Sequence, residues 1–194
     1  MSKNTLWSSI LALLTLFIAP IAEAHILYNE EHSWIAGFYH PLLGIDHILV
    51  MLATGLWAAQ QGGNKLWQLP LVFLIVMAFG TTLGFNGFLL PMVRTGTISS
   101  VLLLGLLLAL ATRFSLLPTL LLTGLFALFH GYDHATEIPF GVNSIDYCIG
   151  FLTTTSLLLS AGAFLGVCSS VMNLDNVLRI IGIGIGVAGG LLWI

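Results

Sequence analysis

Charge is scarce in this sequence of 194 residues, and its scarcity excludes most soluble classes of protein. Five Lys and Arg residues and eight Asp and Glu residues make up 7% of the chain, against roughly 25% in an ordinary soluble domain. Hydrophobic residues account for 58%. A soluble globular domain, a disordered chain and a nucleic-acid-binding protein all need more charge than this. The composition predicts an integral membrane protein, with the lipid bilayer around it and no nucleic acid as partner.

Cysteine and nucleotide-binding motifs are also scarce or missing. Cys148 and Cys168, the two cysteines, lie in one apolar stretch. At a helical rise of ~1.5 Å per residue they would be ~30 Å apart, and a disulfide needs Cα atoms within ~7 Å of each other. We therefore expect both thiols to be unpaired, and cysteine usage indicates no redox compartment. No Walker A motif is present, so no ATPase subunit is evident in this chain.

The first 24 residues have the three parts of a secretory signal peptide. Lys3 supplies the positive charge, residues 6–21 are apolar, and Ala22-Glu23-Ala24 is a small-x-small cleavage site just after Pro20. We predict that residues 1–24 are removed and that residues 25–194 form a single transmembrane domain. The alternative is an uncleaved first span.

Apolar runs of about 20 residues divide the mature chain into six predicted transmembrane helices, an all-α polytopic bundle. Their approximate ranges are 37–60, 66–87, 95–112, 116–137, 142–168 and 175–194. Cleavage places the mature N-terminus outside, and Lys65, Arg113 and Arg179 then fall inside, as the positive-inside rule requires. Arg94 is the exception and is interpreted as an interface anchor. The expected location is a bacterial inner membrane, crossed several times.

Glycines at four-residue spacing predict closely packed helices. They are Gly182, Gly186 and Gly190 in the last segment, and Gly80 and Gly84 in the second. GxxxG spacing lets helix backbones approach each other. We expect ordinary packing between helices, with a homo-oligomer through these faces as an option.

The first predicted span carries His40, Pro41, Asp46 and His47. In a continuous helix two residues seven apart lie within ~20° of each other, so His40 and His47 would share one face. Pro41 fits the first turn of a helix that begins there. Asp46 is either a metal ligand or an acceptor that fixes the tautomer of a histidine.

The fourth predicted span carries His130, Asp133, His134 and Glu137 at positions i, i+3, i+4 and i+7. These side chains project from one helical stripe. The predicted topology puts both clusters in the outer half of the membrane, where they would face each other. Ionisable residues inside a bilayer are functional candidates by default. Imidazoles with carboxylates suit Ni²⁺, Co²⁺, Zn²⁺ or Cu²⁺ as a transported substrate; hydrogen-bonded packing histidines and a bis-histidine haem site are the alternatives.

Three further residues are weaker candidates for metal ligands. After cleavage His25 would offer an α-amino group and an imidazole, and His32 follows in the same segment. These two form either a capture arm or a solvated tail. Met51, one turn after His47, is a soft ligand or, more simply, a core residue.

At these residues the sequence resembles the HupE/UreJ family of small membrane proteins. The resemblance covers the whole chain and rests on His40-Pro41-x-x-Gly44-x-Asp46-His47-x-x-x-Met51 and on Phe129-His130-Gly131-Tyr132. It implies a nickel permease, or a cobalt permease as in some lineages, associated with hydrogenase or urease maturation. It also implies functional roles for His40, Asp46, His47, His130, His134 and Glu137. The chain departs from the family pattern at Asp133 and Ala135, where alanine and glycine are usual, and the extra carboxylate bears on the choice of metal.

The resulting hypothesis is a permease, not an enzyme, that moves a divalent transition metal inward through the site on the first and fourth mature helices. A rival from another class is a zinc-dependent intramembrane hydrolase, although the sequence has no H-E-x-x-H or G-x-S-x-G motif. A metal-binding sensor or accessory protein that does not transport is the third option.

Overall fold

The computed structural model describes residues 32–194, so the predicted signal peptide and His25 lie outside the described residues. The described residues form seven α-helices and no strand, which confirms the all-α prediction. The helices are α2 (Ser33–Leu43), α3 (Ile45–Gln61), α4 (Lys65–Phe85), α5 (Val93–Ala109), α6 (Leu116–Thr136), α7 (Ser144–Val171) and α8 (Asp175–Leu191). Both cysteines are free, as expected.

The lengths of the helices decide how many of them reach across a bilayer. Within residues 32–194, α4, α6 and α7 are long and apolar enough to cross, and the bent pair α2 and α3 adds a fourth span if it counts as one. Helices α5 and α8 have 17 residues each, about 26 Å of helix against a hydrocarbon core of ~30 Å. A multi-pass membrane protein is therefore confirmed, while the count of six spans stays a prediction.

The first predicted span is not one continuous helix, which corrects the sequence interpretation. It breaks at Gly44, whose backbone is extended, and α2 and α3 meet at an angle of 79°. Pro41 lies inside α2 instead of starting a helix. Helix α2 ends at Leu43, two residues after Pro41. Gly44 then serves as both the C-cap of α2 and the N-cap of α3.

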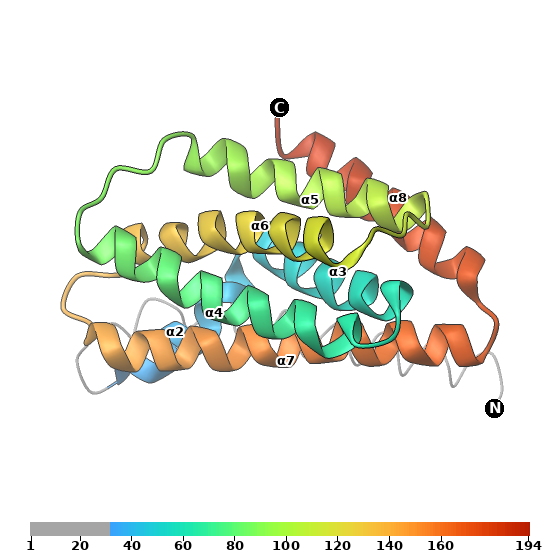
Figure 1. Ribbon diagram of the computed structural model, residues 1–194. Helices are drawn as coiled ribbons and strands as arrows, with labels where there is room; N and C mark the ends of the chain where they lie inside the picture. The colour runs from blue at the N-terminus through green and yellow to red at the C-terminus, as the bar shows by residue number, and fades with distance from the viewer. Residues whose placement is uncertain (1–31) are drawn as a thin grey trace, which may run out of the picture.

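The helices form a bundle with α7 along one side and α5 and α8 together on the other (Figure 1). Helix α4 packs on α6, and α7 packs on both α2 and α3. A Cβ added at Gly131 would lie 2.0 Å from the Met77 carbonyl oxygen, so only glycine permits the close contact between α4 and α6. This contact places the last two turns of α6, which carry its histidines, against α4.

Helix α2 is held against α7 more than against its neighbour in sequence. A Cβ added at Gly37 would lie 2.0 Å from the carbonyl oxygen of Tyr147. The Asn143 N–H donates to Ser33 Oγ at 2.8 Å, and Thr154 Oγ1 donates to the Phe38 carbonyl at 2.6 Å. The position of His40 is therefore set by α7.

The glycines predicted to pack closely on the last helix do so against another helix of the same chain. Gly189 takes the place of the predicted Gly190. Cβ atoms added at Gly182 and Gly189 would lie 2.5 Å from the backbone nitrogens of Ala109 and Leu102 on α5, whereas nothing lies within 4 Å of one added at Gly190. Close packing by these glycines is thus observed between α8 and α5. A homo-oligomer stays a prediction.

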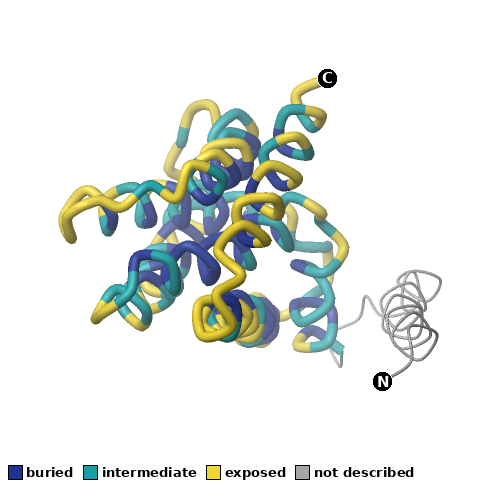
Figure 2. The backbone as a smooth tube through the Cα atoms, turned by 90° about the vertical axis from the view of Figure 1, so that its right-hand side faces the viewer, coloured by how far each residue is buried: buried dark blue, intermediate teal, exposed yellow. Residues whose placement is uncertain are grey.

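Buried faces point inward and exposed faces outward, yet the outward faces are apolar (Figure 2). Trp57, Phe73 and Phe151 are fully buried in the core, while Ile75 and Phe164 are exposed. Large apolar side chains on the outside are what a bilayer, and not water, accepts.

A polar network closes the end of the bundle at which α3 ends and α6 begins. Gln61 Nε2 donates to the Thr112 carbonyl at 2.6 Å, and Gln61 Oε1 accepts from the Phe114 N–H at 3.2 Å. Trp57 Nε1 donates to the same Thr112 carbonyl at 3.3 Å, and Lys65 Nζ donates to Gln61 Oε1 at 3.3 Å and to the Phe114 carbonyl. We refer to these groups as the Gln61 network; it ties the connection between α3 and α4 to that between α5 and α6.

Candidate metal site

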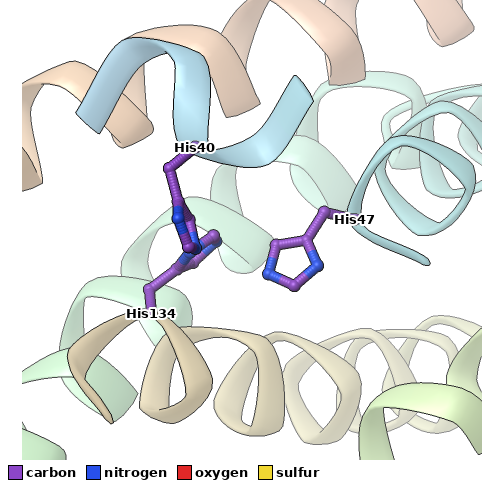
Figure 3. Close-up of side chains that lie close together, drawn as sticks. All are labelled: His40, His47 and His134. Carbon is purple, nitrogen blue, oxygen red and sulfur yellow. The ribbon is translucent and has the colours of Figure 1, made fainter. Parts of the chain in front are cut away.

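Four histidines gather at the other end of the bundle, where α2 and α6 end and α3 begins; we refer to His40, His47, His130 and His134 as the histidine cluster. The ring centroids of His47 and His134 are 4.5 Å apart, and those of His40 and His134 are 4.9 Å apart. The His130 ring lies 5.2 Å from His47. Figure 3 shows His40, His47 and His134 reaching toward one another from α2, α3 and α6. The structure thus brings together the two histidine pairs predicted to face each other.

The break at Gly44 lets both histidines of the first motif reach the same place. On a continuous helix, residues seven apart are ~10.5 Å apart along the axis. With the 79° bend, the rings of His40 and His47 come within 5.7 Å of each other, centroid to centroid. The sequence predicted that His40 and His47 come together, and they do. The cause is the bend at Gly44 and not, as predicted, the periodicity of one continuous helix.

Two groups of side chains are close enough to hold a metal ion. One is His40, His47 and His134, the imidazole group; the other is His47, Asp133 and Glu137, the mixed group. In each group one ligand atom per residue lies within 4.8 Å of the others. His47 belongs to both groups, so the two groups adjoin at this ring.

Asp46 determines which nitrogen of His47 is available. Asp46 Oδ1 lies 2.9 Å from His47 Nδ1 and also accepts from the His47 backbone N–H at 3.0 Å. Since a carboxylate only accepts, Nδ1 carries a proton, and in the neutral imidazole Nε2 then keeps its lone pair. His47 Nε2 is buried and has no hydrogen-bond partner. Of the two predicted roles for Asp46, this geometry fits the acceptor that fixes a tautomer, and Asp46 belongs to neither group.

His134 is held by an aromatic ring instead of a hydrogen bond. Its imidazole stacks on Phe151 of α7, with centroids 4.6 Å apart and ring planes 17° apart. His134 is fully buried, and neither of its ring nitrogens has a hydrogen-bond partner. A buried imidazole with no partner is costly in an apolar bundle, and a bound cation would supply what is missing.

A cleft of about 710 Å³ leads from the surface to the histidine cluster. Its polar lining consists of His40, Asp46, His47, Arg94, Asp133, Thr136 and Glu137. The carboxylate residues are partly exposed, whereas His130 and His134 are fully buried. The site therefore has carboxylates at its opening and imidazoles deeper in.

The charge around the cleft favours a cation. Glu137 Oε2 lies 3.2 Å from His40 Nε2, and the nearness of this ring lowers the pKa of the Glu137 carboxyl, which keeps it ionised. The C-terminal ends of α2 and α6, which carry partial negative charge, also lie here. The N-terminal end of α3 carries partial positive charge, and Asp46 in its first turn offsets it.

Some candidates lie elsewhere. His32 is the N-cap of α2 and belongs to neither group, and His25 is outside the described residues. Met51 is fully buried in the hydrophobic core, in agreement with its simpler interpretation.

Sequence reasoning missed three residues of this region. Arg94, interpreted as an interface anchor, lines the cleft. Phe151 supports His134, and Ser100 Oγ lies 2.9 Å from His130 Nε2. Serine and phenylalanine are ordinary residues in apolar helices, and no spacing relates them to the histidine motifs, so the sequence contained no signal for them.

The chain is similar to a known protein family and to a relative within it. A model of the family described as HupE / UreJ protein matches residues 12–192. The chain is 41% identical over 146 residues to Protein HupE of Rhizobium leguminosarum bv. viciae, covering 75% of this chain and 76% of that protein. No solved structure matches the chain. The protein belongs to the HupE / UreJ family.

Proposed function

We propose that this protein is a permease that carries a divalent transition-metal ion across the bacterial inner membrane, with the histidine cluster as its binding site. One observation carries the proposal: His40, His47 and His134 present ligand atoms within 4.8 Å of one another. Buried nitrogens of His47 and His134 have no hydrogen-bond partner, and His40 Nε2 faces only Glu137 Oε2, at 3.2 Å. Purely structural histidines in an apolar bundle would satisfy these atoms.

The ligand types narrow the choice of ion. Neutral imidazoles with carboxylates suit Ni²⁺, Co²⁺, Zn²⁺ and Cu²⁺, whereas Mg²⁺ and Ca²⁺ prefer oxygen ligands alone. The resemblance in the two histidine motifs favours nickel first and cobalt second. Asp133, the departure from the family pattern, belongs to the mixed group and would add a charged oxygen to the site.

The two groups suggest an order of binding. A hydrated ion enters the cleft, where the carboxylates of Asp133 and Glu137 offset the loss of its water. It then passes by way of His47 to the imidazole group, which lies deeper in the bundle. If the cleft faces outward, as the predicted signal peptide implies, the membrane potential favours inward movement by ~2.3 kcal/mol per charge per 100 mV, about twice that for a dication. This transport requires neither ATP nor catalysis.

Flux through purified protein tests the proposal. The full chain is reconstituted in liposomes with an inside-negative potential, and Ni²⁺ and Co²⁺ uptake is measured with an indicator inside the liposomes. We expect uptake by the wild-type protein and its loss in His47→Ala and His130→Ala. Ser169→Ala is the matched control, since Ser169 is a buried residue whose hydroxyl bonds to the Leu174 carbonyl at the Gln61 end of the bundle.

The outcomes separate the alternatives. Unchanged uptake in both histidine variants would overturn the site assignment. Metal binding without flux in the wild-type protein would favour a sensor or accessory role over a permease.

A further inference from the structure

Ser100 is a buried residue of α5 that touches the histidine cluster from outside both metal-binding groups. It is fully buried, and so is His130. Ser100 Oγ lies 2.9 Å from His130 Nε2 and 2.6 Å from the Thr97 carbonyl oxygen. One hydroxyl thus links a histidine of α6 to a backbone carbonyl of α5.

The helices are close enough for this link because of a glycine. A Cβ added at Gly96, one turn before Ser100, would lie 2.4 Å from Cγ of Phe129. Only a residue without a side chain lets α5 approach the Phe129 ring so closely. Ser100 thereby comes within hydrogen-bond distance of the next residue of α6, His130.

Counting protons assigns the tautomer of His130. A serine hydroxyl has one hydrogen, and the Thr97 carbonyl only accepts, so that hydrogen points to Thr97. Ser100 Oγ is then an acceptor for His130, and His130 Nε2 carries a proton. In a neutral imidazole the other nitrogen, Nδ1, then has a free lone pair. His130 Nδ1 is indeed buried and has no hydrogen-bond partner.

We propose that Ser100 is a positioning residue that holds His130, which belongs to neither of the two groups, as its Nε2–H tautomer, so that Nδ1 is the atom His130 can offer to a metal ion beside His47. The inference rests on the proposed function for the metal, but the tautomer is a property of the metal-free protein. Ser100 thus acts on His130 as Asp46 acts on His47. Asp46 accepts from Nδ1 of His47, whereas Ser100 accepts from Nε2 of His130. His47 presents Nε2 and His130 presents Nδ1, from rings whose centroids are 5.2 Å apart.

The closing experiment compares Ser100→Ala, Ser100→Thr and the control Ser169→Ala in the full chain. Long-range ¹H–¹⁵N correlation spectra of ¹⁵N-histidine-labelled, metal-free protein report the tautomer of His130, whose signals are identified by their loss in His130→Gln. Ni²⁺ affinity is measured by titration on the same samples. Thermal unfolding checks that each variant is folded.

We expect the Nε2–H tautomer of His130 in the wild-type protein and in Ser100→Thr, which keeps the hydroxyl. In Ser100→Ala we expect the Nδ1–H form to appear and Ni²⁺ affinity to fall by about tenfold, as for other residues that orient metal-binding histidines. Ser169→Ala should change neither. An Nδ1–H tautomer in the wild-type protein, or an unchanged tautomer and affinity in a folded Ser100→Ala, would overturn the proposal. If the wild-type protein binds no Ni²⁺ while the tautomer switches as expected, the proposed function fails and the role of Ser100 in setting the tautomer stands.

Discussion

The two ends of this bundle each contain a polar cluster in apolar surroundings. The clusters differ in whether their buried polar atoms have hydrogen-bond partners. In the Gln61 network, both polar atoms of the Gln61 side chain have partners, as do Trp57 Nε1 and Lys65 Nζ. In the histidine cluster, buried nitrogens of His47, His130 and His134 have none. One cluster is complete as it stands, and the other is complete only with a ligand.

This difference separates structural from functional polar residues better than residue type does. A buried polar atom without a partner costs about 1–3 kcal/mol, and the histidine cluster has several. The Gln61 end is not free of such atoms, since Gln60 Oε1 and Gln68 Oε1 also lack partners. Those are single amide oxygens, whereas the imidazole nitrogens converge within 4.8 Å of one another. Convergence of lone pairs, more than their presence, indicates a metal site.

Of the changes that compare the two ends, Asp46→Ala is expected to have the largest effect on metal affinity. It removes a hydrogen bond from the histidine cluster. Without the carboxylate, His47 Nδ1 loses its acceptor and the ring is free to present the wrong nitrogen. We expect Ni²⁺ affinity to fall by about 10- to 100-fold in a titration of purified protein.

Two further variants accompany this prediction. Asp46→Asn keeps an acceptor for His47 Nδ1 and should retain more affinity than Asp46→Ala if Asp46 acts only through His47. Asp146→Ala is the matched control, an aspartate in the first turn of α7 that does not line the cleft. Equal losses in Asp46→Ala and Asp46→Asn would make Asp46 a direct ligand.

A smaller effect is expected from acidification, which acts on the two ends differently. An unperturbed imidazole has a pKa of about 6.5, and a protonated imidazole cannot bind a metal ion. With one imidazole of the site protonated at the lower pH, Ni²⁺ binding should weaken by about tenfold between a pH of about 7.5 and a pH of about 5.5. The hydrogen bonds of the Gln61 network involve no imidazole and no carboxylate. Ni²⁺ affinity that does not change with pH would argue against imidazole ligands.

Gln61→Ala is expected to have the smallest effect on metal affinity. It should lower the stability of the protein instead. The variant leaves the Phe114 N–H and part of the Thr112 carbonyl without partners. We expect a loss of about 1–3 kcal/mol in unfolding free energy and a Tm lower by several degrees, with Ni²⁺ affinity unchanged.

Gln68→Ala serves as the control for this variant, because Gln68 Oε1 at the same end has no partner to lose. A marked loss of Ni²⁺ affinity in a folded Gln61→Ala protein would contradict the purely structural role of the Gln61 network.

Helical periodicity made the second histidine motif predictable from the sequence. His130, Asp133, His134 and Glu137 lie on one stripe because α6 is regular through Thr136, and regular helices obey their 3.6-residue repeat. The convergence with the first motif followed from placing both at one depth. Length and apolarity were likewise enough to predict a helical membrane protein.

The geometry of the first motif was not predictable in the same way. Proline followed by glycine is compatible with a helix that starts at Pro41 and with one that ends at Gly44, and tertiary packing of α2 on α7 selects the second. Ser100 and Phe151 reach the site only through the packing of α5 and α7, which no local pattern in the sequence encodes.

The anchoring of α2 also has a consequence for biosynthesis. Two hydrogen bonds hold this helix, and their partners are far away in the sequence. Ser33 bonds to Asn143, just before α7, and Phe38 bonds to Thr154 in α7; the separations are 110 and 116 positions. During synthesis, the ribosome makes His40 and His47 long before it makes the helix against which α2 packs. The packing that positions His40 for the imidazole group is therefore available only once α7 has been made.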